Sequence, residues 1–355
     1  MDRRTFLSTA FSTSALAAAG TGTLLRGAEA GSALIKPKPL KAGDTVALIT
    51  PATYVSNPDA LLLAQRTVEF LELKWKLGRN AGKRNGYLGG TVDERVQDLH
   101  AAFTDPGVQG VWCIRGGYGS AMLLDKIDYA LIRGHAKIFV GYSDITALHL
   151  GIQKKAGIVT FHGPMALAAF SEYTLAHFRR ALFDARPLGL QANPDEGHVI
   201  RPKHRLRTLR GGRGAGELAG GNLSLICSLM GTPYELDTDG KLLFLEDVGE
   251  QPYAMDRMLT QLRLAGKFRR IQGLILGECS ECVPSEYKPA FESSFSLGEV
   301  YDNILGELKV PLLSGLAIGH TDDQLTLPLG VRATLDADAG TLSFEETALD
   351  SGSSV

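Results

Sequence analysis

A serine at a strand-to-helix turn is the first residue in this sequence that could do covalent chemistry. Ser143 stands in the segment Gly-Tyr-Ser-Asp at 141–144, between the apolar run 137–140 and a helical pattern that starts at Ile145. Such a turn exposes the hydroxyl at the positive end of the following helix, and a backbone N–H there can face a developing oxyanion. The pattern Gly-x-Ser-x-Gly is not met, because Ile145 follows Asp144. Ser143 could also serve only as the N-cap of the helix, a position that serine favours.

A serine hydroxyl is a poor nucleophile at neutral pH, so a neighbouring base must take its proton. Of the eight histidines, two follow apolar strands and stand before polar loops, His162 and His320. Five others fall in helical patterns or in a polar connection: His100, His149, His177, His198 and His204. The carboxylate that orients the base is expected to close the apolar run 242–245. Three acidic residues stand there: Glu246, with Asp247 and Glu250 as competitors.

A second break after a buried strand is Arg-Gly-Gly-Tyr-Gly at 115–119. Consecutive glycines allow backbone amides to approach a ligand closely. Gly116 and Gly117 could complete an oxyanion hole with the amide of Asp144. Arg115 could bind a substrate carboxylate through two hydrogen bonds. The alternatives are a plain tight turn and a structural salt bridge, and neither glycine-rich break matches a dinucleotide or phosphate-loop pattern.

The elements that must position these groups alternate between short apolar runs and amphipathic stretches. The first half predicts buried strands at 44–50, 110–114, 137–140 and 158–161, and helices at 58–77, 93–103, 121–127 and 145–155. Continuous apolar strands in a repeated β-α-β order are typical of a parallel sheet with helices on both faces, an α/β fold. In such sheets functional residues collect at the carboxyl ends of strands, where both glycine-rich breaks fall.

The length of 355 residues favours two domains. Residues 31–170 are predicted as the nucleophile domain, and 171–210, rich in Arg, His and Pro, as the connection. Residues 211–348 are predicted as a second α/β domain that supplies Glu246 and His320. Its expected helices are 222–230, 252–265 and 297–308, its strands 242–245, 271–276 and 311–316, and its hairpins fall at 325–344.

Composition and the first thirty residues limit where the protein works. A formal net charge of -2 with scattered Lys and Arg gives no sign of nucleic-acid binding. Arg3-Arg4 before Phe6-Leu7, a weakly apolar stretch and Ala28-Glu29-Ala30 together indicate a twin-arginine export signal over residues 1–30. Cleavage after Ala30 would give a periplasmic protein, and a retained membrane anchor is the alternative. No later run approaches about 18 continuous apolar residues, so the mature chain is not expected to span a membrane.

The four cysteines do not indicate a metal site. Cys113 and Cys227 stand in apolar runs, as small core residues do. Cys279 and Cys282 form a CxxC, but no second pair of ligands has the spacing that zinc requires. A disulfide and a redox pair both stay open for this CxxC.

Seven segments together resemble the LD-carboxypeptidase family, which includes muramoyltetrapeptide carboxypeptidases and microcin C self-immunity peptidases. They lie, in the order that the family shows, at 115–119, 141–144, 161–164, 220–222, 245–247, 319–320 and 325–330. The similarity runs from about Gly43 to Phe344. Each segment is a weak signal alone, but their common order and intervals make the resemblance specific.

The resemblance implies a triad of Ser143 as nucleophile, His320 as base and Glu246 as its orienting carboxylate. The family does not fix the position of His162 as histidine, so that residue is not expected to be the base. The resemblance also implies two domains with the site in the cleft between them. The implied reaction is hydrolysis of the L–D bond to the terminal D-Ala of a murein tetrapeptide through an acyl-enzyme, in cell-wall recycling or remodelling.

Substrate contacts follow less directly from these motifs, and the candidates are Arg115, Tyr118 and Asn222. The expected partner is a small peptide substrate, and the reaction needs no metal or organic cofactor. The sequence does not determine the oligomeric state, for which a homodimer is one candidate. The export signal departs from the family's well-known relatives, which act in the cytoplasm, and this leaves the physiological substrate pool open.

Two other functions compete with this interpretation. A self-immunity type peptidase would use the same triad to cleave peptidyl or aminoacyl nucleotide analogues, and only cleft loops, at 171–210 and 279–296, would differ. A periplasmic binding protein would also have two α/β domains around a cleft. It would not need Ser143 and His320 within about 2.6–3.2 Å of each other.

Overall fold

The computed structural model describes residues 34–55, 57–285, 291 and 293–352, which belong to one compact unit. The predicted export signal and its cleavage point after Ala30 lie outside the described residues. Within the described part of the chain, no helix combines the length and the apolar character that a membrane span requires.

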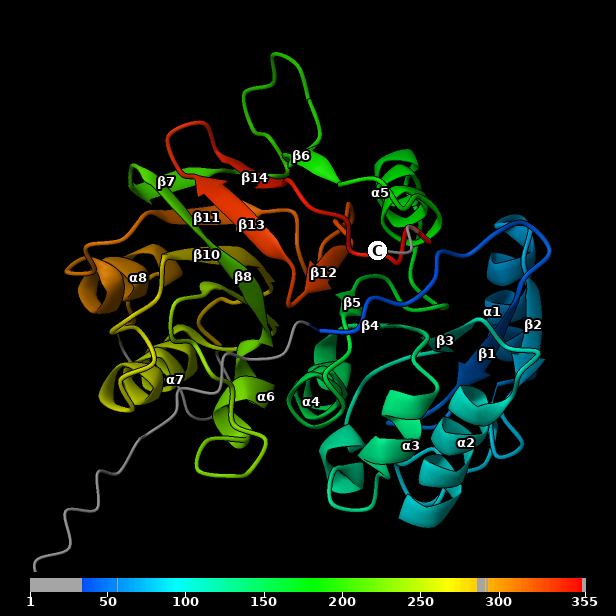
Figure 1. Ribbon diagram of the computed structural model, residues 1–355. Helices are drawn as coiled ribbons and strands as arrows, with labels where there is room; N and C mark the ends of the chain where they lie inside the picture. The colour runs from blue at the N-terminus through cyan, green and yellow to red at the C-terminus, as the bar shows by residue number, and fades with distance from the viewer. Residues whose placement is uncertain (1–33, 56, 286–290, 292, 353–355) are drawn as a thin grey trace, which may run out of the picture. The chain divides into compact units, whose positions relative to one another are not determined.

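The first sheet has six strands in the order β12-β5-β4-β3-β1-β2 (Figure 1). Their bounds are β1 (Thr45–Ile49), β2 (Lys74–Leu77), β3 (Gly110–Cys113), β4 (Ile138–Gly141), β5 (Thr160–His162) and β12 (Leu327–Leu329). Strands β1 to β5 are parallel, and for β1, β3, β4 and β5 this confirms the prediction from their apolar runs. Strand β12 comes from far along the chain and pairs antiparallel with β5 at the edge. The parallel order brings the carboxyl ends of β1, β3 and β4 to one edge.

Two helices of the first half, those predicted at 58–77 and 121–127, are shorter than the sequence pattern predicts, whereas the helix predicted at 93–103 extends by one residue at each end. The helices of this half are α1 (Pro58–Phe70), α2 (Val92–Thr104), α3 (Tyr129–Gly134) and α4 (Thr146–Gly151), with a 3-10 turn at Ser120–Leu123 and a π-helical turn at Ile152–Ala156. The helix expected over 58–77 ends early because Glu72 takes a left-handed φ of 62°. The residues that follow form β2, an edge strand. Its side chains are mostly exposed, so no pattern of buried residues marks it in the sequence.

The second sheet has eight strands in the order β6-β14-β13-β8-β9-β10-β11-β7. Their bounds are β6 (Gly189–Gln191), β7 (Arg207–Arg210), β8 (Arg213–Asn222), β9 (Leu242–Val248), β10 (Gly273–Ser280), β11 (Leu312–Leu316), β13 (Arg332–Asp336) and β14 (Thr341–Phe344). Strands β8 to β11 are parallel and the outer ones antiparallel. Figure 1 shows α7 (Pro252–Leu264) and α8 (Leu297–Leu305) beside this sheet, near α6 (Leu223–Ser228). The two sheets confirm the predicted α/β class.

The segment 171–210, which was predicted to be a connection, contains regular secondary structure. It forms helix α5 (Glu172–Phe183), followed by β6 and β7, which extend the two edges of the second sheet. Residues 325–344 form the hairpin β13–β14 as predicted, but their first strand, β12, joins the first sheet. Each sheet therefore takes strands from distant parts of the chain, and the domain limits of 31–170 and 211–348 stay a prediction.

The two sheets meet where the nucleophile turn begins helix α4. The backbone N–H of Asn222, at the end of β8, donates to the Thr146 hydroxyl at 3.0 Å. Leu148 of α4 and Ile226 of α6 lie in the same buried apolar cluster. This packing places the carboxyl end of β4 against the carboxyl ends of β8 and β9, so groups from both sheets can share one site.

Candidate active site

Ser143 occupies a strained turn between β4 and α4. Its backbone φ is 62°, in the left-handed region that non-glycine residues seldom adopt at a cost of about 1–2 kcal/mol. The residue starts a 3-10 turn, Ser143–Ile145, that leads directly into α4. Its side chain is half-buried at the sheet edge. These features are those of a nucleophile elbow, although the flanking sequence differs from Gly-x-Ser-x-Gly.

Three residues, one in β9 and two in segments that follow β4 and β11, form a continuous hydrogen-bond chain. The Oγ atom of Ser143 lies 3.1 Å from Nε2 of His320, and Nδ1 of His320 lies 2.8 Å from Oε2 of Glu246. An ionised carboxylate only accepts, so Nδ1 of His320 must carry the hydrogen. Nε2 then holds a lone pair and accepts the Ser143 hydroxyl. The sequence-predicted trio is thus brought together in the geometry of a serine, its base and an orienting acid.

Glu246 is buried but stays ionised. Burial raises the pKa of its carboxyl, whereas the neighbouring His162 and His320 lower it, and the pKa falls to about 2. His162 is fully buried with Nε2 3.7 Å from Oε1 of Glu246, beyond hydrogen-bond length, so it acts on Glu246 electrostatically. His162 does not contact Ser143. His162, the alternative base, instead lies beside the carboxylate of Glu246.

A glycine makes room for the carboxylate of Glu246. Gly319, beside His320, has a left-handed φ of 89°, and a Cβ atom there would clash with Oε2 of Glu246. The competing acids make other contacts, and Glu250 accepts a hydrogen bond of 3.4 Å from the hydroxyl of Ser224. Asp247 accepts hydrogen bonds from the amide of Asn222 at 3.0 Å and the hydroxyl of Ser224 at 2.6 Å. Glu246 is therefore the acid that is placed to orient the imidazole.

The glycine-rich loop is fastened to the nucleophile turn by the carboxylate of Asp144. This carboxylate accepts from the backbone N–H groups of Gly119 at 3.1 Å and Ser120 at 2.8 Å. Gly116 lies against the nucleophile, since a Cβ atom there would come 3.3 Å from Cβ of Ser143 and 3.5 Å from the nitrogen of Asp144. The backbone around Gly116 and the amide of Asp144 therefore border the site where an oxyanion would form.

The substrate-binding candidates take different positions. Arg115 is exposed, and its side chain has no hydrogen bond or ion pair with the described residues. Tyr118 is also exposed, and its ring lies 5.6 Å from that of Tyr87. Asn222 is only 3% exposed. Its side-chain N–H donates to Asp247, and its side-chain oxygen accepts the backbone N–H of Leu225 as the N-cap of α6. Arg115 and Tyr118 can therefore meet a ligand, whereas the role that the contacts of Asn222 indicate is structural.

A cavity of about 550 Å³ opens beside the base. Its lining includes Tyr142 from the nucleophile turn, His320, and three residues at the carboxyl end of β10, namely Glu278, Ser280 and Glu281. The ring of Tyr142 lies 4.9 Å from that of His320. Burial, together with the charge of Glu246, raises the pKa of Tyr142 to about 12, so the phenol stays neutral.

The CxxC, for which the sequence allowed either a disulfide or a redox pair, forms a disulfide at the rim of this cavity. Cys279 and Cys282 are bonded, and the short loop that they close contains Ser280 and Glu281. The hydroxyl of Ser280 donates to the backbone carbonyl of His320. The disulfide therefore closes a loop that contacts the base directly. The other two cysteines are free and buried, as expected of core residues.

Sequence reasoning missed two residues that support the nucleophile side. Thr53 accepts a hydrogen bond from the backbone N–H of Tyr118 at 2.9 Å. Its position just after β1 is a signal, since functional residues gather at the carboxyl ends of parallel strands. Arg95 is buried within α2 and donates to the carbonyls of Pro51 and Gly119, each at 2.8 Å. No local pattern distinguishes Arg95 from a surface arginine.

Comparisons with known proteins identify the family of this chain. Family models match the LD-carboxypeptidase N-terminal domain over residues 46–163 and the C-terminal domain over residues 215–335. A probable murein peptide carboxypeptidase of Bacillus subtilis is 40% identical over 310 residues, which cover 87% of this chain and 94% of the relative.

Solved structures match the described fold closely. The microcin C7 self-immunity protein MccF, known from Escherichia coli, has a TM-score of 0.79 and 28% identity, over 89% of this chain and 100% of that chain. A muramoyltetrapeptide carboxypeptidase from Oxalobacter formigenes has a TM-score of 0.71 and 30% identity, over 84% and 97% of the two chains. On these matches, the chain belongs to the LD-carboxypeptidase family of serine peptidases.

Proposed function

We propose that this protein is an exported carboxypeptidase that releases the terminal D-Ala of murein tetrapeptides through an acyl-enzyme on Ser143. The observation that carries the proposal is the chain from Ser143 through His320 to Glu246, at 3.1 Å and 2.8 Å. A binding protein has no need of a left-handed serine within hydrogen-bond reach of a paired imidazole. The names of the relatives, which include murein peptide and muramoyltetrapeptide carboxypeptidases, supply the substrate class.

The first half of the reaction uses the preformed hydrogen bonds. Nε2 of His320 takes the proton of Ser143 as Oγ attacks the carbonyl carbon of the L–D peptide bond. Glu246 stays ionised and stabilises the imidazolium that forms. The developing oxyanion faces the backbone N–H of Asp144 and the glycine loop at Gly116, which need little reorganisation because Asp144 ties the two segments together.

The second half returns the enzyme to its starting state. His320 gives its proton to the nitrogen of the leaving D-amino acid, and the peptide remains as an ester on Ser143. Water then attacks the ester carbonyl while His320 accepts its proton, and Ser143 recovers a proton as the shortened peptide leaves. Arg115, exposed in the glycine-rich loop, is the residue that we expect to bind the free carboxylate of the substrate.

Export would give the enzyme access to murein peptides outside the cytoplasm. The support is the sequence alone, with Arg3-Arg4 followed by a weakly apolar stretch and Ala28-Glu29-Ala30. Replacing Arg3 and Arg4 by lysine is expected to keep the protein in the cytoplasm. Amino-terminal sequencing of the periplasmic form is expected to begin at Gly31, and a sequence beginning at the initiator methionine would support a retained anchor.

A second candidate is cleavage of aminoacyl or peptidyl nucleotide analogues, favoured by the likeness to the self-immunity protein at a TM-score of 0.79. The two functions separate in one competition assay. The purified protein is incubated with a murein tetrapeptide, the corresponding pentapeptide and an aspartyl sulfamoyl adenosine, and products are identified by mass spectrometry. We expect D-Ala from the tetrapeptide only. Hydrolysis of the sulfamoyl adenosine alone would favour the second candidate.

A further inference from the structure

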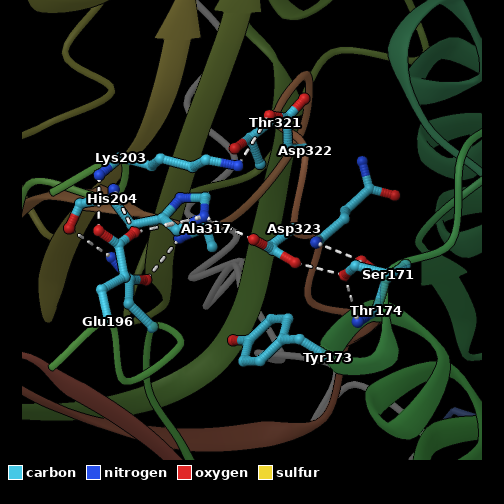
Figure 2. Close-up of polar contacts among 12 residues, drawn as sticks. Ser171, Tyr173, Thr174, Glu196, Lys203, His204, Ala317, Thr321, Asp322 and Asp323 are labelled. Carbon is cyan, nitrogen blue, oxygen red and sulfur yellow. Dashed lines mark hydrogen bonds and ion pairs between the residues drawn. The ribbon is translucent and has the colours of Figure 1, made fainter.

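A buried histidine that the proposed reaction does not use lies beside the loop of the catalytic base. His204 stands between β6 and β7, and its side chain is only 2% exposed. Figure 2 shows its ring among acidic side chains from several segments, with Asp323 on the side toward Ser171, the N-cap of α5. Asp323 belongs to the loop that follows His320. The cluster thus joins the connection between β6 and β7 to the base side of the active site.

Both ring nitrogens of His204 face carboxylates. Nδ1 contacts Oε1 of Glu278 and Nε2 lies 2.9 Å from Oδ2 of Asp323. An ionised carboxylate can only accept a hydrogen bond, so both nitrogens must donate. A neutral imidazole has one N–H and would leave one lone pair pointing at a negative oxygen. The geometry is therefore that of an imidazolium between two carboxylates.

The same two carboxylates hold the loop that carries the base. Glu278 accepts from the hydroxyl of Thr321, the residue after His320, at 2.8 Å. Asp323 accepts from the hydroxyl of Ser171 at the N-cap of α5. The loop from Thr321 to Asp323 is thus fastened to β10 on one side and to α5 on the other, and His204 links the two attachments.

We propose that His204, as an imidazolium between Glu278 and Asp323, is a positioning residue that holds the loop of the catalytic base His320. The proposal rests on the function proposed above, because it assigns His204 a part in the same reaction. The charge of His204 offsets the repulsion between the two acids, which would otherwise move apart and take Thr321 and Asp323 with them. His204 contacts neither Ser143 nor His320 and acts through the loop.

The surrounding charges favour the protonated ring. Burial lowers the pKa of His204, but the hydrogen bonds and charges of Glu278 and Asp323 outweigh it, and the pKa is raised. Glu196, in its own loop, lies 4.0 Å from Nε2 and adds negative charge. Among the residues labelled in Figure 2, Lys203 is the cation beside this cluster. Its Nζ pairs with the exposed Asp322 at 3.6 Å. Tyr173 of α5 also faces the cluster. Burial and the charges of Asp323 and Glu278 raise the pKa of its phenol, which is therefore neutral.

The sign of the pH effect follows from this direction. A raised pKa means that the imidazolium is fully present below the usual value of about 6.5 and is lost as the pH rises through the raised value. Neutral His204 would release one of its two carboxylates and loosen the base loop. Turnover by the wild type is therefore expected to decline on the alkaline side, in a step that depends on His204.

The test compares wild type with His204→Gln, using His100→Gln as the matched control. His100 is a half-buried histidine on α2 that accepts the N–H of Asp128 and lies outside the cluster. Three readouts are taken from pH 5.5 to 9: kcat and KM for D-Ala release, the rate at which a fluorophosphonate labels Ser143, and the ring 15N shifts of His204. We expect about a 10-fold lower kcat and labelling rate at pH 7 in His204→Gln. KM should change little, and the alkaline decline should disappear.

Each outcome bears on one claim. A neutral ring at pH 7, or full kcat and labelling in a folded His204→Gln protein, would overturn the positioning role and leave the proposed function intact. Labelling that depends on His204 without any release of D-Ala would refute the proposed substrate and support the positioning role. Loss of folding in His204→Gln would move the test to the wild-type ring shifts and labelling profile, where a charged ring whose deprotonation slows labelling is the supporting result.

Discussion

The two halves of the active site are held in place by different kinds of contact. The nucleophile side is built from neighbouring segments of one sheet, and Asp144 ties its turn to Gly119 across 25 residues of sequence. The base side depends on distant segments, since His320 bonds Glu246 across 74 residues and Asp323 meets His204 across 119. The reactivity of Ser143 is thus set by a local turn, whereas the base is set by tertiary packing. Changes far from the cleft should therefore affect the base side first.

Removal of the base is expected to give the largest loss of kcat and to leave the nucleophile side intact. His320→Asn should lower kcat for D-Ala release by about 10⁴-fold or more, because Ser143 then has no group to take its proton. The nucleophile turn should keep its structure, since its contacts with the glycine loop do not involve His320. Steady-state kinetics with His135→Asn as a control checks the effect, and a loss below about 10-fold would mean that another group is the base.

A single added methyl group at the base side should have the second-largest effect on kcat. Gly319→Ala would place a Cβ atom against the carboxylate of Glu246 in a left-handed backbone conformation. Displacing this carboxylate by about 1 Å should lower kcat by about 10²-fold. Gly134→Ala is the matched control, because a Cβ atom there meets nothing within 4 Å. Equal kcat in the two variants would show that the position of Glu246 is not critical.

The nucleophile side should tolerate an equivalent change better. Asp144→Asn keeps one acceptor but turns an amide N–H toward a backbone donor, either Gly119 or Ser120. We expect about a 10-fold lower kcat and a free energy of unfolding lower by about 1–3 kcal/mol. Urea unfolding of this variant and of the exposed Asp59→Asn measures the second effect. A kcat loss as large as that of Gly319→Ala would contradict the proposed difference between the halves.

The smallest effect on rate, with a clear pH signature, is expected at His162. Its two ring nitrogens have no hydrogen-bond partner among the described residues, so His162→Phe should fit the site with only a few-fold change in kcat. His162 helps to lower the pKa of Glu246 to about 2, and its loss should raise that pKa. A lowered pKa contributes stability above the ordinary value, near 4.5, that is lost as the pH falls through the folded value.

The measurement for His162 is the thermal unfolding midpoint between pH 7 and pH 2.5. His162→Phe should begin to lose stability at a higher pH than the wild type. Curves that run parallel down to pH 2.5 would show that His162 does not set the charge of Glu246.

The difference between the halves also explains what the sequence could predict. Apolar strands followed by Gly-Tyr-Ser-Asp are local signals, so the parallel sheet and the turn at Ser143 were predictable from pattern alone. Strand β8 was not, because it is glycine-rich: Gly220 approaches the backbone of Phe244 so closely that any Cβ atom would clash. Its pairing with β9 is visible only in the assembled sheet.

The supports of the base could not be predicted for the same reason. His204 stands in a polar segment without periodicity, and its partners Glu278 and Asp323 lie 74 and 119 residues away. His162 and His320 have the same local setting, a strand followed by a polar loop, and only the fold puts one behind Glu246 and the other beside Ser143. The resemblance to a family selected His320, where local physical chemistry left both open.

The central claim is that Ser143 is the nucleophile of an LD-carboxypeptidase. Its most direct test incubates purified wild type and Ser143→Ala with a murein tetrapeptide and measures released D-Ala by mass spectrometry. Release by the wild type alone, with a covalent peptidyl adduct on Ser143 in rapidly quenched samples, is the predicted result. Equal release by Ser143→Ala, or no release by the wild type, would contradict it.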